Sequence, residues 1–218
     1  MVELFTSEGC SSCPPADAVL ADLAGDPRVI ALSFHVDYWD ELGWRDPFAS
    51  PDSTSRQRAY ASSFGTRSLY TPQLVVGGVD PLGGSDRGQA ETDITANLDR
   101  ATGVGLSVEV ETDGAGSLVV ETRPSGAPPL AVVNVALVQR SATSQVRAGE
   151  NAGRTLQHVD IVRGFTSGTS AGPGMLRLEM PRGLRREDAQ IVAFVQAAPS
   201  QGRGMPILAA TQVMLPRR

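Results

Sequence analysis

The sequence contains no lysine, and all 19 basic residues among its 218 are arginine. Lysine is normally one of the commonest residues, so its absence indicates the codon bias of a GC-rich genome rather than a mechanism. The arginines do not cluster, and the net charge is -5. Because nucleic-acid binding needs a concentrated basic surface, we expect no nucleic-acid partner.

Long apolar runs are also absent. The longest, residues 130–138, contains Asn134, whereas a helix that crosses a bilayer needs about 20 apolar residues, so we expect no membrane span. The chain enters an apolar stretch at Val2 with no leader pattern before it. A secretory leader that had been removed earlier is compatible with this start. The composition, 41% hydrophobic and 20% charged, is typical of a globular protein.

Several catalytic motifs are missing. The chain has no G-x-S-x-G, no phosphate-binding loop and no H-E-x-x-H, which excludes the common serine hydrolase, NTPase and zinc protease sites. A structural zinc needs four ligands, and beyond two cysteines the chain offers only His35 and His158. We therefore expect no zinc site and no cofactor.

Up to about residue 103, short apolar runs alternate with stretches of helical periodicity. The runs predict strands at 2–6, 28–36 and 74–79, the last of which turns into a hairpin at Gly77 and Gly78, and the periodicity predicts helices at 16–23, 50–64 and 91–101. This order predicts an α/β domain, residues 1–103, with a small sheet covered by helices.

From Val104 onward apolar residues alternate with polar ones, which is typical of half-buried strands. Seven strand-like stretches are separated by Gly, Ser, Pro and Asn: 104–110, 118–122, 130–140, 155–165, 176–180, 190–197 and 206–215. This spacing predicts an all-β antiparallel sandwich as a second domain, residues 104–218.

The two cysteines, Cys10 and Cys13, form a C-x-x-C pair between the first predicted strand and the first helix. The start of a helix offers unpaired N–H groups and the positive end of the helix dipole, which stabilise a thiolate. Cys10 is then the expected nucleophile and Cys13 the resolving thiol. A disulfide across two intervening residues closes too short a loop to stabilise much, so we favour thiol chemistry over an inert bridge.

Thr71-Pro72 precedes the strand that starts at Gln73, and an X-Pro bond adopts the cis form at modest cost. The order strand, C-x-x-C, helix, strand, helix, Thr-Pro, strand, Gly-rich hairpin, helix resembles the thioredoxin fold. That resemblance implies a cis-proline, Pro72, that faces the cysteine pair and clamps the substrate backbone.

Four segments give a closer resemblance: VELFTSEGCSSCPPAD, LSFHVDYWDELGWRDPFASP, YTPQLVVGG and GENAGRTL. They are similar to the mostly exported bacterial family called domain of unknown function 1223. The resemblance covers nearly the whole chain and implies the fold more firmly than an activity. Between the cysteines stand Ser11 and Ser12, which leaves the direction of electron flow open. Pro14 and Pro15 follow Cys13, and a residue before proline avoids the α conformation, so the helix is expected to start at Pro14 or Pro15.

Polar and aromatic residues follow the second strand, at the sheet end where α/β folds place ligands. His35 and Asp37 are candidates for a proton relay, although a hydrogen-bonded core histidine is the commoner outcome. Trp39, Trp44 and Phe48 are candidates for an apolar rim that contacts a peptide substrate; packing beneath the loop is the alternative. Thr71, next to Pro72, is a further candidate for substrate binding.

Two further polar groups are expected to be structural. Arg56, Arg58 and Tyr60 lie on one predicted helix, where a solvated face is typical. Residues 149–154 form a turn between predicted strands, and His158 follows it. Side-chain hydrogen bonds that hold the turn are the favoured interpretation over a small polar site.

The leading hypothesis is a periplasmic or secreted thiol-disulfide oxidoreductase whose partners are protein or small-molecule thiols and disulfides. Two cysteines and no others suit an oxidising compartment. The oxidoreductase hypothesis requires that the sulfurs are exposed, that they lie at the start of a helix, and that a cis peptide bond lies next to them. The second domain is expected to recruit a protein partner. One alternative is a binding module that has lost turnover, and the other is a copper-handling protein that uses Cys10, Cys13 and His35.

Overall fold

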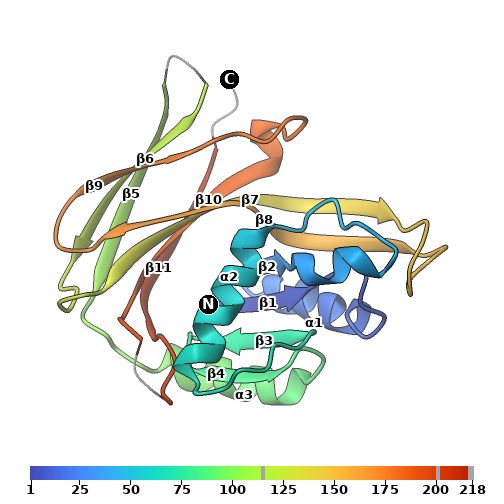
Figure 1. The fold of residues 1–218 in the computed structure, drawn as a ribbon. Coiled ribbons are helices and arrows are strands. Elements are labelled where there is room, and N and C mark those ends of the chain that lie inside the picture. Colours follow the sequence, from blue (N-terminus) through green and yellow to red (C-terminus); the bar gives the residue numbers. More distant parts are fainter. Residues whose placement is uncertain (114–115, 200–201, 216–218) are drawn as a thin grey trace.

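The first part of the chain forms the expected alternation of strands and helices (Figure 1). The computed structural model describes residues 1–113, 116–199 and 202–215. The elements up to residue 98 are β1 (Val2–Thr6), α1 (Pro14–Ala24), β2 (Ala31–His35), the 3-10 helix η1 (Asp37–Leu42), α2 (Pro51–Ser63), β3 (Gln73–Val76), β4 (Asp80–Gly83) and α3 (Arg87–Leu98).

Local sequence explains where these helices begin. Helix α1 starts at Pro14 with Pro15 next, because proline has no N–H to lose in the first turn. The Ser50 hydroxyl caps α2 by accepting from the Asp52 N–H. Helix α3 begins earlier than the apolar pattern predicts, because the Asp86 carboxylate caps it by accepting from the Gln89 N–H.

The second part contains the seven predicted strands among its described residues. They are β5 (Gly105–Thr112), β6 (Leu118–Ser125), β7 (Val132–Gln145), β8 (Thr155–Thr169), β9 (Gly174–Leu178), β10 (Ala189–Gln196) and β11 (Ile207–Met214), with a 3-10 turn, η2 (Arg186–Asp188), before β10.

These strands do not form a sandwich that is clearly separate from the first part. Four of them extend the first sheet, in the order β11-β10-β7-β8-β2-β1-β3-β4, and the other three form a small sheet, β5-β6-β9. Strands β1 and β2 are parallel, and β8 joins β2 where Ile161 pairs with Ser33. The expected second unit is thus corrected to a mixed sheet with a small antiparallel sheet packed on it. The boundary near residue 103 stays a prediction.

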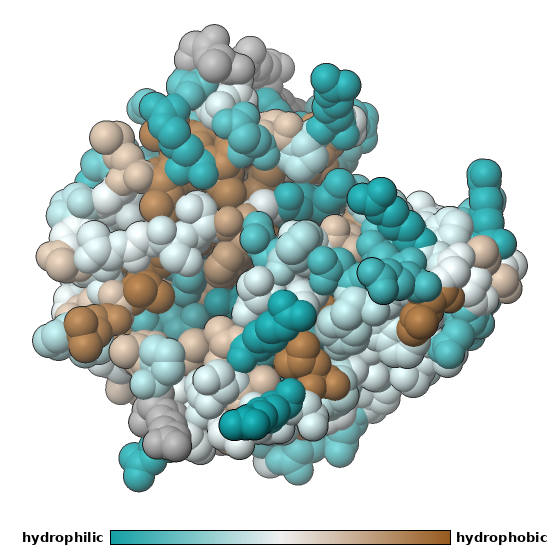
Figure 2. All heavy atoms as spheres, viewed as in Figure 1, coloured by the Kyte–Doolittle hydropathy of each residue, from teal (hydrophilic) through white to brown (hydrophobic). Residues whose placement is uncertain are grey.

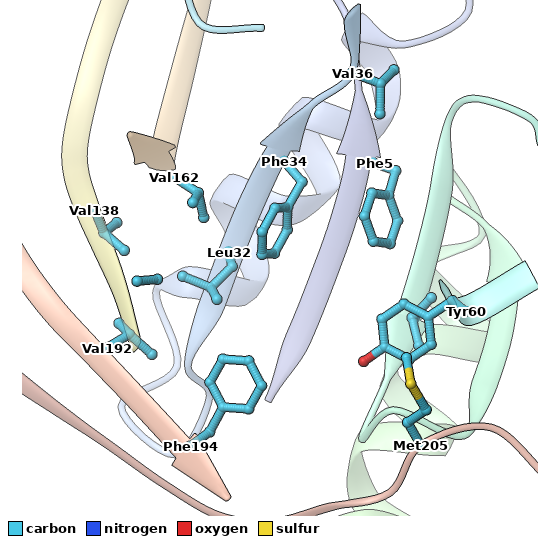
Figure 3. Close-up of a cluster of buried hydrophobic side chains, with 12 residues drawn as sticks. Phe5, Leu32, Phe34, Val36, Tyr60, Val138, Val162, Val192, Phe194 and Met205 are labelled. Carbon is cyan, nitrogen blue, oxygen red and sulfur yellow. The ribbon is translucent and has the colours of Figure 1, made fainter. Parts of the chain in front are cut away.

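Strand alternation builds a different core on each face of the sheet. Val2 and Leu4 of β1 face α1 and α3, where they pack with Leu20, Leu74 and other apolar residues. Phe5 points to the opposite face, which α2 covers. There it meets side chains from β2, α2, β8 and β10, including Phe34, Tyr60, Val162 and Phe194 (Figure 3). Since this second core combines residues from both parts of the chain, it holds them together.

A third core lies between the small sheet and the long strands. Leu118 and Val120 of β6 and Leu178 of β9 pack against Val135 of β7 and Ile191 of β10. Figure 2 shows apolar atoms gathered mainly on the side of the molecule where Figure 1 places the small sheet. No helix in the described residues is long and apolar enough to span a membrane.

One expectation about α2 is wrong, because Arg56 and Tyr60 are buried rather than solvated. Glu3 of β1 points to the same face as Phe5 and is fully buried. Arg56 Nε donates to Glu3 Oε1 over 2.5 Å, and the Tyr60 hydroxyl donates to Glu3 Oε2. A buried carboxylate needs such partners, and they come from α2. Arg58, on the other side of that helix, is exposed.

Candidate functional site

Cys10 and Cys13 are joined by a disulfide in the loop between β1 and α1, with Cα atoms 5.4 Å apart. Cys13 is the N-cap residue of α1, so the pair lies at the helix start as predicted. Its backbone is α-helical, with φ -77° and ψ -37°, which differs from the conformation expected before Pro14. Its carbonyl accepts from the N–H groups of Ala16 and Asp17, and these bonds hold the helical geometry.

The sulfurs are not exposed, contrary to the requirement inferred from the sequence. Cys10 and Cys13 are both 0% exposed, whereas Ser11 and Ser12 between them lie at the surface. The Ser12 hydroxyl is 3.3 Å from Cys10 Sγ and can donate to it. A partner molecule therefore reaches the disulfide only after something moves.

The tip of the β7–β8 hairpin, residues 146–154, is hydrogen-bonded to the loop that carries the cysteines. The Asn151 amide nitrogen donates to the carbonyls of both Glu8 and Cys10, each over 2.9 Å, and its side chain is fully buried. Beside it, Glu150 Oε2 accepts from the Ser11 N–H at 3.0 Å, and this contact lowers the pKa of Glu150. Figure 1 shows the long hairpin running from the small sheet to the side that holds α1.

Close packing fixes the tip against the loop after η1. Gly149 has φ +74°, and a Cβ there would lie 3.1 Å from the Trp44 Cβ. Glycine is the residue that accepts both the left-handed backbone and so close an approach. The turn at 149–154 is held by side-chain hydrogen bonds, as expected, for Arg154 donates to Asn151 Oδ1. That the same turn is bonded to the cysteine loop was not expected.

Thr71-Pro72 is a cis peptide bond, as predicted, and its loop lies beside the start of α1. A Cβ built on Gly84 would be 2.8 Å from the Cβ atoms of both Ala16 and Pro72, so these two residues are neighbours across that glycine. Trp39 links the same loop to the cysteine loop. Its Nε1 donates to Thr71 Oγ1 over 2.8 Å, and its Cβ lies 3.1 Å from a Cβ built on Gly9.

The two tryptophans expected at a substrate rim are both half-buried. Trp39 lies between Thr71 and the cysteine loop, which is compatible with substrate contact. Trp44 instead donates from Nε1 to Glu8 Oε2 over 2.7 Å. The indole Nε1 of Trp44 thus points to a buried carboxylate. Trp44 packs beneath the loop, which was the alternative to a place at the substrate rim.

A buried group of carboxyl and imidazole side chains lies on the α1 side of the sheet, where β1 and β2 end. Its members are Glu8, Asp17, His35, Asp46 and His158, none more than 8% exposed. We call them the acid–histidine cluster. The rings of His35 and His158 are 4.8 Å apart between centroids. Two of the five, Glu8 and Asp17, belong to the loop and helix that carry the cysteines.

Within this cluster His35 pairs with Asp46, not with Asp37. His35 Nδ1 is 2.7 Å from Asp46 Oδ2, which also accepts from the Glu8 N–H at 2.9 Å. Burial by itself lowers the pKa of His35, but the carboxylates of Asp46, Asp17 and Glu8 together outweigh burial and the net shift is upward. Burial raises the pKa of Asp46, and the contact to His35 together with the N–H groups of Glu8 and Phe48 outweighs it, so that pKa falls. Both shifts favour the charged pair of imidazolium and carboxylate.

Asp37, expected to assist His35, lies elsewhere. The Thr54 hydroxyl donates to Asp37 Oδ1 at 2.5 Å, and the Asp37 backbone N–H donates to Thr54 Oγ1 at 3.1 Å. These contacts fasten η1 to α2. The proton-relay role expected of His35 and Asp37 stays a prediction for His35, and the geometry supplies no path from Asp37 to His35.

The geometry does not favour copper handling by Cys10, Cys13 and His35. The two cysteines are bonded to each other, and His35 is paired with Asp46. Within residues 1–113, 116–199 and 202–215, no group of three or more His, Cys, Asp or Glu side chains has the arrangement of a metal site.

Sequence reasoning did not identify Asp17 and Asp46 of the acid–histidine cluster, and it interpreted Asn151 only as part of a turn. One feature of the sequence could have indicated the polar cluster. Strand alternation puts Thr6 on the face of Val2 and Leu4, and His35 on the face of Ala31, so the polar side chains at the ends of both strands lie on one face of the sheet. Nothing in the pattern connects residue 151 with residue 10.

The chain is similar to two solved structures. One is protein AGR_C_4864 from Agrobacterium tumefaciens, with 28% identity and a TM-score of 0.74 over 100% of this chain and 94% of that one. The other is HBP35 of Porphyromonas gingivalis, with 16% identity and a TM-score of 0.66 over 98% of this chain and 74% of that one, a likeness of fold alone. The fold is thioredoxin-like.

The sequence was also compared with curated proteins and with models of protein families. A search of curated proteins found no match. A family model described as "Protein of unknown function (DUF1223)" matches residues 1–196. That span includes every residue described above around the disulfide, so the cysteine pair, the acid–histidine cluster and the hairpin tip all lie inside the matched region.

Proposed function

We propose that this chain, which belongs to the DUF1223 family of proteins of unknown function, exchanges thiols and disulfides through Cys10 and Cys13. The carrying observation is a C-x-x-C disulfide at the first turn of α1, in a thioredoxin-like fold whose cis Thr71-Pro72 bond packs near Ala16 of the same helix. Protein or small-molecule thiols are the proposed partners. Pro72, Thr71 and Trp39 are the proposed contacts to such a partner.

The exchange follows ordinary thiol chemistry. A substrate thiolate attacks Cys10 Sγ, the bond between Cys10 and Cys13 breaks, and Cys13 leaves as a thiolate that takes up a proton. A second substrate thiolate attacks the substrate sulfur of the mixed disulfide and releases Cys10. The substrate is oxidised to a disulfide and the cysteine pair is reduced. In the opposite direction Cys13 resolves the mixed disulfide.

Because both sulfurs are buried, the proposal requires the hairpin tip to move aside. The contacts that hold the tip to the cysteine loop come from Glu150, which is exposed, and Asn151. Breaking so few bonds is compatible with local opening that leaves the rest of the fold intact. Partner recruitment through the strands after residue 103 stays a prediction. Two of these strands contribute the hairpin tip that is bonded to the cysteine loop.

The first experiment asks whether the disulfide reacts in the folded protein. The oxidised protein is mixed with dithiothreitol at several concentrations, free thiols are counted by alkylation and mass spectrometry, and circular dichroism follows the fold. We expect reduction whose rate rises with thiol concentration while the dichroism signal stays constant. Reduction only as fast as global unfolding, at every thiol concentration, would overturn the proposal.

A trapping experiment assigns the two cysteines. With oxidised glutathione, the Cys13→Ser variant is expected to accumulate a mixed disulfide at Cys10, because the resolving thiol is missing. The Cys10→Ser variant is the matched control and is expected to react more slowly. Equal trapping by the two variants would contradict Cys10 as the attacking thiol.

A non-catalytic binding module is the second candidate, and one observation favours it. Both sulfurs are 0% exposed, as in a disulfide that only braces a loop. The dithiothreitol experiment separates the candidates, because a bracing disulfide is reduced only when the protein unfolds.

We also propose an oxidising location, in the periplasm or outside the cell. Both cysteines of the chain are used in one disulfide, and such bonds persist mainly in oxidising compartments. Rapid alkylation of cells that make the protein tests this: a pair found fully reduced would contradict the location.

A further inference from the structure

A hollow of about 480 Å³ lies on the α2 face of the large sheet, the face opposite α1. Helix α2 supplies Asp52, Ser55, Arg56 and Ala59, whose spacing places them on one side of the helix. The rest of the lining comes from the start of β7, the end of β8 and the chain that follows β10. Both parts of the chain thus form the hollow. Ligand pockets favour such junctions, and a volume of roughly 300–1,000 Å³ suits a small molecule.

The walls of this hollow are mainly apolar. They are formed by Ala59, Leu130, Val132, Phe165 and Met205. Leu130 is 84% exposed and has a φ of 65°. A leucine in this left-handed region is uncommon, because its Cβ crowds the backbone there and glycine or asparagine is the usual choice. Neither burial nor the backbone conformation therefore explains a leucine at the rim, whereas contact with an apolar ligand would.

Arg56 forms the charged part of the floor. Its side chain is only 6% exposed. The guanidinium donates to Glu3, to Gln196 Oε1 over 3.3 Å and to the Tyr60 hydroxyl over 3.2 Å. A guanidinium has five N–H groups, so two of them have no acceptor within the described part of the chain. A buried N–H without an acceptor is costly, and a ligand oxygen in the hollow would satisfy it.

The amide oxygens of the floor, by contrast, are already in use. Gln196 Oε1 accepts from Arg56 and, over 3.1 Å, from Asn134 Nδ2. Asn134 Oδ1 accepts from the Ser167 hydroxyl over 2.7 Å. The floor thus has donors to spare while its amide oxygens hold hydrogen bonds within the protein. A ligand that matches it brings an oxygen acceptor rather than an N–H donor.

The charges at the hollow favour an uncharged ligand. Glu3 is bonded to Arg56 and balances its charge, and Asp52, at the exposed start of α2, adds a negative charge to the lining. The hollow therefore has no net positive charge with which to compensate a carboxylate for its lost hydration. An uncharged carbonyl loses less hydration on entry and still accepts from Arg56.

We propose that this hollow binds an uncharged small molecule that has an apolar body and a carbonyl oxygen, as a carboxamide or an ester has. The carbonyl oxygen accepts from the N–H groups that Arg56 has to spare. The apolar body lies against Val132 and Phe165, and Leu130 closes over it at the rim. Binding is non-covalent, and the site is separate from the cysteine pair.

The test uses three probes that share one apolar chain: hexanamide, hexanoate and hexylammonium. Each is titrated into the oxidised full chain labelled with nitrogen-15, and the shifts of the backbone amide signals give the dissociation constant. We expect hexanamide to bind about tenfold or more tightly than hexylammonium, which brings no acceptor and leaves the Arg56 N–H groups unpaired. Hexanoate should also bind more weakly than hexanamide, because it stays charged. The shifted signals should include those of Val132 and Ser167, which line the hollow.

Variants locate the site and its donor. Ala59→Phe fills the hollow from an exposed position and should abolish hexanamide binding. Arg58→Phe adds the same ring at an exposed position of α2 outside the lining, and as the matched control it should bind like the wild type. Glu3→Leu combined with Arg56→Met removes the donor and its counter-charge together, an exchange that buried ion pairs often tolerate. This double variant should lose the preference for hexanamide over hexylammonium.

Three outcomes would overturn the inference. They are equal affinities of the wild type for the three probes, hexanamide binding that Ala59→Phe leaves unchanged, and the absence of saturable binding by the folded wild type up to the solubility of hexanamide. Because the hollow and the disulfide lie at different places in the fold, none of these outcomes depends on whether the cysteines exchange with thiols.

Discussion

The Asn151 side chain donates to the carbonyl of Cys10, 141 positions away in the sequence. The same nitrogen donates to the Glu8 carbonyl, and Asn151 Oδ1 accepts from Arg154. One buried amide thus satisfies two carbonyls of the cysteine loop and one guanidinium of the hairpin tip. It thereby ties the hairpin tip to the cysteine loop.

Replacement of this amide should uncover the disulfide. Asn151→Ala leaves two carbonyls without a donor, so we expect the free energy of unfolding to fall by about 2–4 kcal/mol. Reduction by dithiothreitol should accelerate about tenfold for each 1.4 kcal/mol by which the closed tip is weakened. Glu150→Gln, a change at an exposed residue that keeps an acceptor for Ser11, is the control. Reduction of the Asn151 variant at the wild-type rate would show that the tip is not the barrier.

The Ser12 hydroxyl is the group placed to stabilise a Cys10 thiolate. Pro14 and Pro15 have no N–H, and the N–H groups of Ala16 and Asp17 already donate to the Cys13 carbonyl. The first turn of α1 therefore supplies little donor capacity, and Ser12 Oγ lies 3.3 Å from Cys10 Sγ.

In the Cys13→Ser background, Ser12→Ala should lower the alkylation rate of Cys10 near neutral pH by about tenfold or more, since a hydrogen bond to a charged group contributes about 1.5–3 kcal/mol. Iodoacetamide and mass spectrometry measure this rate. Ser11→Ala is the matched control, because Ser11 is equally exposed but has no contact to either sulfur among the described interactions. Equal rates for the two serine variants would rule out the hydroxyl as a thiolate donor.

Gly84 sets the distance between Pro72 and α1. A Cβ at this buried position would be 2.8 Å from Ala16 and Pro72 and 2.9 Å from Leu4. Overpacking of this kind costs about 1–3 kcal/mol, so Gly84→Ala should lower stability to urea by that amount. Gly83→Ala is the control, because a Cβ at Gly83 meets nothing within 4 Å. Equal stability of the two variants would contradict tight packing of the Pro72 loop on α1.

Local pattern predicted most of the elements, because each depends on residues close in sequence. The run 2–6 is strand β1, and the seven alternating stretches after residue 103 are β5 to β11. The pattern did not predict how strands from distant segments pair. It expected a separate sandwich, whereas β8 adds to β2 at Ser33. Alternating apolar residues show that a strand has a buried face, but they do not identify the strand beside it.

The sequence predicted the site residues that belong to short motifs, but not those that reach the site from distant parts of the chain. Cys10, Cys13 and the cis bond at Pro72 follow from motif and resemblance. His158 and Asn151 reach the cysteine loop only through the β7–β8 hairpin, a contact over about 140 positions. Arg56 could have been found, since Glu3 in an apolar strand requires a buried cation.

Asp160 gives a prediction about stability and pH. It is half-buried in β8 with φ 47°, and Gln190 Nε2 donates to its Oδ1 over 3.0 Å. Burial raises the pKa of Asp160 to about 6, and Arg140 opposes this only in part. The folded state therefore binds this proton more tightly than the unfolded state, where an ordinary aspartate has a pKa of about 3.9. Stability is highest when the group is protonated and declines as pH rises from about 4 through about 6.

Asp160→Asn removes the charge and keeps both the acceptor and a side chain that tolerates positive φ. Above pH 6 we expect it to be more stable than the wild type by about 1–2 kcal/mol, allowing for partial exposure, and near pH 4 the two should be equal. Urea unfolding at several pH values measures the difference. Asp160→Ala should show the same pH dependence as Asp160→Asn. It should be less stable than Asp160→Asn at every pH, because it loses the Gln190 contact and strains the left-handed backbone. A constant gap between Asp160→Asn and the wild type across this range would mean that the carboxyl has the same pKa in the folded and unfolded states, and would contradict a pKa raised by burial.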